Sequence, residues 1–574
     1  MSVGRARRVF DYALTYAAER EQFGQPIGKF QGISFQLADM ITEIDAADLL
    51  TLAAADRLDK NLSSNREIAS AKLYATEMLS RVTDTAIQIH GGMGLMDDYP
   101  LERFWRDARS LAVIGGGAWG EAVLTQAKKF GFEGNLYAVH PVKPEATIGA
   151  VERMRKLEVG GAVCFASGYA EANGEDTSGT DAQARLLRAA GDMPILGPNC
   201  YGFINALDGV AVWPDQHGCK RVDTGVAILT QSSNISINMT MQTRGLPIGY
   251  MITAGNQAQT TQADVALALL DDPRVTAIGL HIEGFGDLSR WEALAAKAHA
   301  KSIPLVALKV GKSSHAQQAT ISHTASLAGG DTAAQAFLDR LGILRSPDVP
   351  SFLETLKLLH VAGRLPSNQI SSISCSGGEA SLVADMANEH DLTFPALTDD
   401  QKQGLFKTLG PKVALANPLD YHTYIWRDED AMTDAWSAMA ASHIALTLVV
   451  LDYPRGDICD ATDWACATNA ALRMRKATGR PVAVAASLPE LLPEHVAQQL
   501  IEGDVVPFAG IAEALNAIEA ASRPAYAPSS DAVLRKIDRH RYGNPVGIRC
   551  QNRACSSWIK RPEGHPNQSL APRA

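Results

Sequence analysis

Hydrophobic positions follow a helical period in the N-terminal part of the chain. Residues 70–89 show apolar positions at three- and four-residue steps, and an earlier stripe does the same at Leu37, Met40, Ile44, Ala47 and Leu50. This spacing places apolar side chains on one face of a helix, which is typical of helices that pack into a bundle. Short stretches rich in glycine and asparagine interrupt the pattern. We therefore expect residues 1–112 to form long amphipathic helices.

The period changes at Leu111. Residues 111–141 combine a short apolar run, a glycine-rich turn, an amphipathic helix and a second apolar run, which is the usual opening of an α/β unit. Similar apolar runs, each ending in turn residues, recur as GAVCFASG, PILGPN, GVAILTQ, TAIGLHIEG, IPLVALKVG, QISSISCSGG, ALTLVVLDYP and PVAVAAS. Helical segments separate most of them, which predicts parallel α/β architecture as far as residue 521. Residues 522–574 lack any period, and we expect them to be disordered.

Composition narrows the classes of function. The chain has 574 residues, of which 46% are hydrophobic and 20% charged, with a formal net charge of −10. This length predicts several domains, and the acidic balance argues against a nucleic-acid partner, which requires a basic face. No apolar run is long enough to span a membrane, and the N-terminus lacks the apolar core of a signal peptide. We expect a cytoplasmic protein without nucleic-acid or membrane partners.

The number and spacing of the cysteines indicate neither disulfides nor a zinc site. The chain has 8 cysteines, which are sparse and lack any paired CxxC spacing. A disulfide framework or a zinc site requires denser or paired cysteines. We therefore expect reduced thiols and no metal site.

Four segments of the helical part contain chemistry suited to a phosphate-bearing cofactor: EREQFGQPIGKFQ, ASAKLYATEM, DTAIQIHGGMG and DYPLERFWRDAR. Arginine and amides at helix ends can bind phosphate, and glycines let the backbone approach closely, although each feature alone is usual on a protein surface. Together the segments resemble the C-terminal helical domain of the acyl-CoA dehydrogenases over residues 1–112. In that family the matching positions touch the FAD of a neighbouring subunit, and here they are Arg20, Phe23, Gln31, Gln88, Gly91 and Gly92.

The same resemblance implies what this segment lacks. Acyl-CoA dehydrogenases hold most of the flavin and the acyl-CoA in two further domains, and many place a catalytic glutamate shortly after the RDAR motif. Here the chain passes from Arg109 directly into a glycine-rich loop. We therefore expect a vestigial flavin site without bound FAD. The segment is interpreted as a retained bundle or a fusion scar, and we expect the chain to form a homo-oligomer through it.

A second set of motifs spans the α/β part. The loop IGGGAWG follows an apolar run and opens a helix, where backbone N–H groups and the helix dipole favour a phosphate. Further motifs follow in the order SGYAEANG, LGPNCYG, AGNQAQTTQADV, HIEGFGD, KVGKSSHA, ISHTASLAGGD and ANPLDYH. Together they resemble the NDP-forming acyl-CoA synthetases, relatives of succinyl-CoA synthetase, over residues 113–521.

This second resemblance implies the domain organisation. A Rossmann-like CoA-binding domain is expected at residues 113–220, and a flavodoxin-like domain with a phosphohistidine at 221–362. A second flavodoxin-like ligase domain is expected at 363–521. The expected fold class is therefore α/β, with an N-terminal α-helical bundle before these three domains.

The chemistry of that family centres on a histidine that carries phosphate between two sites, while CoA thiolate attacks an acyl phosphate. Imidazole suits this task because it is nucleophilic when neutral and a good leaving group when protonated. A lone histidine is more often a packing or surface residue, but His323 lies between Ser322 and Thr324, ahead of small residues that leave room for a phosphoryl group. His323 matches the phosphohistidine of the family. Glu283 matches the glutamate that orients it, although an acidic residue at a strand end is also common.

The resemblance also implies binding positions. For CoA they are Gly115, Gly117, Ala118, Trp119, Lys143, Asn199 and Cys200. For phosphate, two helix N-termini contribute Ser232, Ser233, Asn234, Gly377 and Gly378. The first of these loops departs from the family pattern, because Ser233 stands where glycine is usual. A second departure is the interval from Pro141 to Gly161, 161 − 141 = 20 residues, which is too short for the strand and crossovers that the family has there. We expect the CoA domain to lack one strand.

No glycine-rich ATP-binding stretch follows residue 521, so we expect ATP and ADP to bind an ATP-grasp subunit in trans. The sequence thus predicts the acid–CoA ligase portion of an NDP-forming acyl-CoA synthetase, acting on CoA and an acyl acid or acyl-CoA. Two alternatives stay open: a non-catalytic CoA-binding or assembly module, and a residual FAD-dependent acyl-CoA dehydrogenase-like protein. Neither the acyl acid nor the choice between ATP and GTP follows from the sequence.

Overall fold

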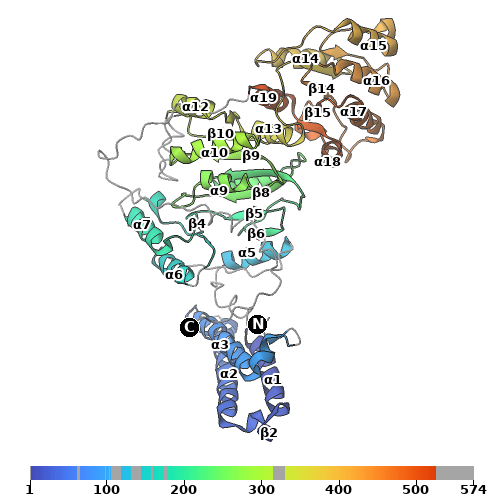
Figure 1. The fold of residues 1–574 in the computed structure, drawn as a ribbon. Coiled ribbons are helices and arrows are strands. Elements are labelled where there is room, and N and C mark those ends of the chain that lie inside the picture. Colours follow the sequence, from blue (N-terminus) through green and yellow to red (C-terminus); the bar gives the residue numbers. More distant parts are fainter. Residues whose placement is uncertain are drawn as a thin grey trace, which may run out of the picture. The chain divides into compact units, whose positions relative to one another are not determined.

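The computed structural model describes residues 2–60, 62, 65–96, 99–101, 104, 118–130, 144–156, 159–172, 178–313 and 330–524 (Figure 1). The chain divides into two compact units. The first contains the helical N-terminus as far as Ala150 together with Val212–Asp215. The second contains Val151–Ala211 and the chain from Gln216 onward.

The first unit is built on three long helices, α1 (Ser2–Glu19), α2 (Gln31–Asp59) and α3 (Asn65–His90). Short elements connect and follow them: β1 (Glu21–Gln22), β2 (Gln25–Pro26), η1 (Ile27–Lys29) and η2 (Gly91–Leu95). The strands β1 and β2 form an antiparallel pair. Helices α5 (Ala118–Lys129) and α6 (Pro144–Lys156) come next along the chain.

The core of the helical bundle follows the predicted spacing. Helix α1 contributes only small or β-branched residues, Ala6, Val9, Ala13 and Ala17, and all are at most 1% exposed. Small side chains at three- and four-residue steps let α1 pack closely on α2 and α3. On α2 the stripe is buried from Leu37 to Ala47 and resumes at Ala54, while Leu50 is 38% exposed. The predicted helical N-terminus is confirmed, with one apolar position outside its core.

The second unit begins with a parallel pair of short strands, β3 (Ala162–Val163) and β4 (Ile195–Leu196). The short helix η3 (Ala170–Ala172) and helix α7 (Ser178–Ala190) lie between these strands in the sequence. The predicted strand GAVCFASG is thus only two residues long among the described residues.

A seven-stranded sheet follows, with the strand order β11-β10-β9-β7-β8-β5-β6. Its strands are β5 (Phe203–Asn205), β6 (Val210–Val212), β7 (Gly225–Thr230), β8 (Ile248–Thr253), β9 (Val275–Ile282), β10 (Leu305–Lys309) and β11 (Leu344–Arg345). Strands β7 to β11 are parallel, and β5 runs antiparallel to β8. Connecting helices are α8 (Ser233–Thr240), α9 (Gln262–Leu269), α10 (Leu288–Ala300) and α12 (Asp331–Arg340). The register pairs Thr230 with His281 and His281 with Leu308, so β7, β9 and β10 end at one edge.

A five-stranded parallel sheet forms the C-terminal part, with the order β13-β12-β14-β15-β16. Its strands are β12 (Ile370–Ser374), β13 (Leu419–Asp420), β14 (Leu446–Val450), β15 (Val482–Ala486) and β16 (Val505–Ala509). Its helices are α14 (Gly377–Ala387), α15 (Asp399–Leu409), α16 (Glu429–Met439), α17 (Ala465–Thr478), α18 (Glu494–Glu502) and α19 (Ile511–Ser522). Three short helices complete it: η4 (Gly410–Lys412), η5 (Thr462–Trp464) and η6 (Pro489–Leu491). The fully buried Trp436 anchors its core.

Helix α13 (Val349–Val361) joins the two sheets (Figure 1). It packs on β9 and β10 of the first sheet and on α19 and β16 of the second, and its residues from Ser351 to Leu359 are all buried. Glu354 and Lys357 are fully buried polar residues of this helix, and they pair with each other at 2.7 Å. Arg244, from the loop before β8, contacts Glu354 at 2.7 Å. A buried charge requires such partners because desolvation is costly.

The predicted mixed α/β fold with a helical N-terminus and parallel-sheet domains is confirmed in outline. The domain boundaries at 112, 220 and 362 stay predictions, and β5 and β6 lie on the N-terminal side of 220 while pairing into the sheet that follows it. The predicted strands around residues 111–115 and 135–141 and the tail from residue 525 lie outside the described residues. Across the described part of the chain, no helix is long and apolar enough to cross a membrane.

Candidate functional site

The edge where β7, β9 and β10 end also contains the start of α8. Strand β7 ends at Thr230 and the helix begins at Ser233, directly after Ser232. The first N–H groups of an α-helix have no intrahelical partner, and together with the helix dipole they favour an anion. Ser233 is half-buried and Asn234 is exposed in this first turn. The predicted phosphate positions Ser232, Ser233 and Asn234 therefore lie together at the helix N-terminus, and their function stays a prediction.

Glu283 lies at the same edge, directly after β9, and its side chain is half-buried. The backbone N–H groups of Glu283 and Gly284 donate to Oε1 of Gln231 at 2.5 and 2.9 Å. In return, Nε2 of Gln231 donates to the Gly284 carbonyl at 2.7 Å. Gln231 immediately precedes Ser232. The structure therefore brings the predicted orienting glutamate next to the predicted phosphate loop.

Two buried basic side chains complete this edge. Lys309, the last residue of β10, is 2% exposed and donates from Nζ to the Glu283 carbonyl at 3.0 Å and to the Val310 carbonyl. Burial lowers the pKa of Lys309, and the nearby Arg345 acts in the same direction. His281 is 3% exposed, and its Nδ1 lies 3.1 Å from Thr230 Oγ1. Burial, with a smaller effect of Lys309, lowers the pKa of His281 to about 4, so its ring is neutral at pH 7 and enclosed by the sheet.

His323 lies outside the described residues. The described chain on either side shows where its connection begins and ends: β10 ends at Lys309 at this edge, and α12 begins at Asp331. The roles of His323 as phosphate carrier and of Glu283 as its orienting residue stay predictions.

The predicted CoA positions are only partly described. Gly115, Gly117 and Lys143 lie outside the described residues, and Ala118 and Trp119 begin α5. Asn199 has a left-handed backbone with φ of 58°, and its Nδ2 donates to Asn256 Oδ1 at 3.4 Å.

Cys200 points into the protein interior. It is 2% exposed, and its thiol donates to the carbonyls of Cys164 and Leu196 at 3.5 and 3.6 Å. Burial raises the pKa of this thiol, with a further contribution from Cys164. The side chain is therefore a core thiol in the protonated form, and any contact with CoA falls to its backbone. A direct role in binding stays a prediction.

The second predicted phosphate loop lies where β12 meets α14. Gly377 and Gly378 are the first two residues of α14 and are exposed. A Cβ atom at Gly377 would lie 3.1 Å from Asp420 Oδ2, so glycine permits the close approach of that carboxylate. Burial and the carboxylates of Asp452 and Asp420 raise the pKa of Glu379 to about 7. An anion at this helix end is therefore disfavoured by neighbouring negative charge, unless a cation or a proton on Glu379 offsets it.

The predicted flavin positions share one end of the helical bundle. The up-down-up connection brings the ends of α1 and α3 together with the start of α2, and Tyr16 stacks on His90 with ring centroids 4.1 Å apart. All the positions are exposed: Arg20, Phe23, Gln31, Gln88, Gly91 and Gly92. Phe23 is 94% exposed. The predicted flavin positions therefore lie on an exposed face, and the expectation that no FAD is bound stays a prediction.

Family comparisons match two separate parts of the chain. Residues 1–118 match the family model "Acyl-CoA dehydrogenase, C-terminal domain", and residues 223–359 match "Succinyl-CoA ligase like flavodoxin domain". The chain therefore joins a segment similar to the C-terminal domain of acyl-CoA dehydrogenases to a segment similar to the flavodoxin-like domain of succinyl-CoA ligases. Both resemblances inferred from the motifs are confirmed.

Individual relatives extend the comparison. Probable acyl-CoA dehydrogenase YngJ of Bacillus subtilis is 51% identical over 113 residues, which cover 20% of this chain and 30% of that protein. Acetate–CoA ligase [ADP-forming] of Methanocaldococcus jannaschii is 26% identical over 361 residues, which cover 56% of this chain and 49% of that protein. The chain thus covers from 30% to about half of the length of these relatives.

A solved structure supports the fold of the ligase-like part. The apo form of dinucleotide-forming acetyl-coenzyme A synthetase 1 from Ca. Korarchaeum cryptofilum matches with a TM-score of 0.60 and 19% identity, covering 71% of this chain and 94% of that one. The same protein has also been solved in complex with phosphate and ADP. At this identity the match establishes a shared fold.

Several residues at the two strand edges lie in or beside the quoted motifs but were not predicted as site residues. In the succinyl-CoA ligase-like domain these are Gln231 and Lys309, and in the C-terminal sheet they are Glu379, Asp420 and Asp452. Each lies at the end of a strand, within two residues after it, or in the first turn of the helix that follows. A polar residue at the carboxyl end of a parallel strand is the signal that could have found them.

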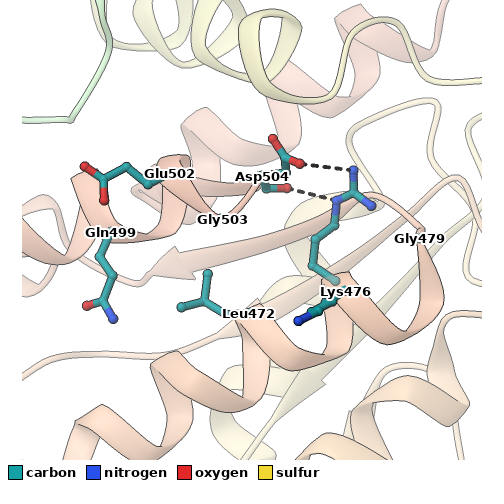
Figure 2. A pocket seen from close by; sticks show the side chains of 8 residues that line it. Leu472, Lys476, Gly479, Gln499, Glu502, Gly503 and Asp504 are labelled. Carbon is teal, nitrogen blue, oxygen red and sulfur yellow. Dashed lines mark hydrogen bonds and ion pairs between the residues drawn. The ribbon is translucent and has the colours of Figure 1, made fainter.

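A cavity of about 490 Å³ lies away from all of these positions (Figure 2). Its lining comes from the ends of α17 and α18: Leu472, Arg475, Lys476, Gly479, Gln499, Glu502, Gly503 and Asp504. Arg475 donates from Nε to the Asp504 carbonyl at 3.2 Å across it. A helix that connects parallel strands ends near the amino end of the next strand. This cavity therefore lies at the amino-end edge of the C-terminal sheet, whereas Glu379 lies at the carboxyl-end edge. It does not contribute to the candidate site.

Proposed function

We propose that this chain is the CoA-ligating portion of an NDP-forming acyl-CoA synthetase, with His323 as a phosphate carrier. One observation supports this most: Glu283 and the N-terminus of α8 lie side by side at the strand edge from which the connection containing His323 departs. The name of the acetate–CoA ligase relative agrees with this chemistry. The proposed domains are the bundle, a Rossmann-like CoA-binding domain at 113–220 and flavodoxin-like domains at 221–362 and 363–521.

The proposed reaction has three transfers. A phosphoryl group moves from ATP to the His323 imidazole and leaves ADP. The carboxylate of the acyl acid then takes the phosphoryl group and becomes an acyl phosphate. Finally the CoA thiolate attacks the carbonyl carbon and displaces phosphate, giving the acyl-CoA.

The residues of this chain have distinct proposed tasks. Glu283 accepts the proton on one ring nitrogen of His323, which keeps the other nitrogen nucleophilic. The N–H groups at the start of α8 stabilise the negative charge of the phosphoryl group in transit. The positions proposed for CoA are Lys143, the loop of residues 115–119 and the segment that includes Asn199.

Three partners belong to this proposal. ATP and ADP bind an ATP-grasp subunit supplied in trans, the acyl acid binds at the shared edge, and the bundle mediates homo-oligomer formation. The bundle itself binds no FAD, because its predicted flavin positions form an exposed face of a single unit. The protein acts in the cytoplasm.

The reverse direction tests the proposal without the ATP-grasp partner. Acetyl-CoA and phosphate should release CoA thiol in a single burst, because each phosphohistidine formed traps one phosphoryl group and liberates one CoA and one acetate. A thiol reagent measures the burst. Because acetyl phosphate formation alone also frees one CoA, acetate is measured alongside the thiol. His323→Ala should release no stoichiometric acetate, since its acetyl phosphate has no histidine to phosphorylate.

The outcome separates the proposal from its alternatives. Absence of any burst with several acyl-CoA substrates, while calorimetry detects CoA binding, would favour a non-catalytic CoA-binding module. Reduction of a dye by acyl-CoA would instead favour residual dehydrogenase chemistry.

A further inference from the structure

The peptide segment at Glu283–Gly284 has an unusual set of hydrogen bonds. Both of its N–H groups donate to Gln231 Oε1, and the Gly284 carbonyl accepts from Gln231 Nε2. The Glu283 carbonyl accepts from Lys309 Nζ at 3.0 Å. Two side chains therefore satisfy every backbone donor and acceptor of these two residues.

These two side chains approach from opposite sides of one strand. Gln231 directly follows β7 and Lys309 ends β10, and both strands pair with β9, whose end precedes Glu283. Gln231 is 4% exposed and Lys309 is 2% exposed. The pair therefore forms a clamp around the end of β9, in a place where water cannot easily replace it.

The cost of burying this clamp argues for a task beyond sheet stability. A buried ammonium group and a buried amide are expensive to desolvate, and apolar residues at strand ends would stabilise a sheet more cheaply. Burial already lowers the pKa of Lys309. The hydrogen bonds that the clamp makes return only part of this desolvation cost.

We propose that Gln231 and Lys309 are positioning residues that hold the backbone of Glu283 in place. This inference rests on the proposed function, in which Glu283 orients His323. Because Gln231 also precedes Ser232, its side chain couples the position of the glutamate to the start of α8. A fixed backbone limits the directions in which the Glu283 carboxylate can reach the imidazole.

The test replaces Gln231 by methionine, which has a similar length but no hydrogen-bonding amide. Gln242→Met is the matched control, since Gln242 also bridges a loop, donating to the Leu246 carbonyl at 2.9 Å and accepting from Arg244 N at 2.6 Å. Acid-labile labelling of the chain by acetyl-CoA and radioactive phosphate is followed in a single turnover. Gln231→Met should label about 10- to 100-fold more slowly, the loss typical of a group that orients another, while the Kd for CoA and the labelling rate of Gln242→Met stay unchanged.

Amide hydrogen exchange provides a readout that does not depend on activity. The amides of Glu283 and Gly284 should exchange faster in Gln231→Met than in wild type, and unchanged exchange there would overturn the clamp. Should Gln231→Met fail to fold, Gln231→Asn shortens the side chain by one methylene and carries the same expectations.

The outcomes distinguish the clamp from the proposed function. If wild type labels and Gln231→Met labels at the same rate, the positioning role is wrong and the proposed function stands. If wild type never labels, the proposed function fails and the positioning role fails with it. A rise in the Kd for CoA equal to the loss of rate would show a general structural defect in place of positioning.

Discussion

The buried charges of α13 allow a sharp test of how the two sheets are held together. Glu354 pairs with Lys357 at 2.7 Å and with Arg244 at 2.7 Å, and both Glu354 and Lys357 are fully buried. Glu354→Ala leaves Lys357 with only the Arg244 carbonyl at 2.8 Å, and it leaves Arg244 with the Ala509 carbonyl at 3.2 Å. Two positive charges then lie close together without a counterion.

Glu354→Ala should lower the free energy of unfolding strongly, because removing one member of a buried ion pair typically costs about 3–5 kcal/mol. A matched control is Glu494→Ala, which breaks the exposed pair of Glu494 with Lys220 at 2.6 Å; this pair joins the segment before β7 to α18 of the C-terminal sheet region. An exposed pair of this kind is worth about 0–1 kcal/mol. Urea unfolding of the full chain, followed by circular dichroism, compares the two variants at pH 7.

The pH dependence gives a second check on the same variant. Burial lowers the pKa of Lys357, and Glu354 opposes this effect, so Glu354→Ala should lower that pKa further. A lysine with a depressed folded-state pKa destabilises the fold below its unfolded pKa, and this penalty shrinks as the pH rises towards that value. The difference in free energy of unfolding between wild type and Glu354→Ala should therefore become smaller from pH 7 to pH 9. If Glu354→Ala lowers the free energy of unfolding at pH 7 by less than about 1 kcal/mol, as the control does, the buried pair does not stabilise the protein as described.

Three further predictions concern the candidate sites. Because the pKa of Glu379 is raised to about 7, the free energy of unfolding should fall as the pH rises from about 4.5 through 7. Glu379→Gln should remove this pH dependence in urea unfolding measured across the same range. His281, with a pKa lowered to about 4, should show a titration midpoint near that value by NMR, and a midpoint near 6.5 would contradict its burial. Lys143→Ala should weaken CoA binding about tenfold by calorimetry, as expected for the loss of one charged phosphate contact; unchanged affinity would remove Lys143 from the site.

Local patterns predicted much of the fold. The helical period of α2 identified its buried face, because side chains three and four residues apart lie on one side of a helix. The prediction that Leu50 belongs to this face was wrong, because the buried face continues at Ala54. The packing of the neighbouring helices decides where the face ends. The apolar run of β8 was missed although all of its residues are buried.

Other features depend on partners that are distant in the sequence. Strands β5 and β6 are three residues each, and β5 exists because it pairs with β8, more than forty residues later in the register Phe203 to Ile252. The contacts of Gln231 with Glu283 and Gly284 likewise span more than fifty residues. Motifs could locate Glu283 and the α8 loop separately. Their proximity required the strand order of the sheet.

The most direct test of the central claim is the site of phosphorylation. The purified chain is incubated with acetyl-CoA and phosphate, digested at neutral pH to preserve phosphohistidine, and analysed by mass spectrometry. We predict a single acid-labile phosphoryl group on the peptide that contains His323, and none in the His323→Ala variant. Acid-labile phosphate on any other histidine, or persisting in His323→Ala, would contradict the proposed mechanism.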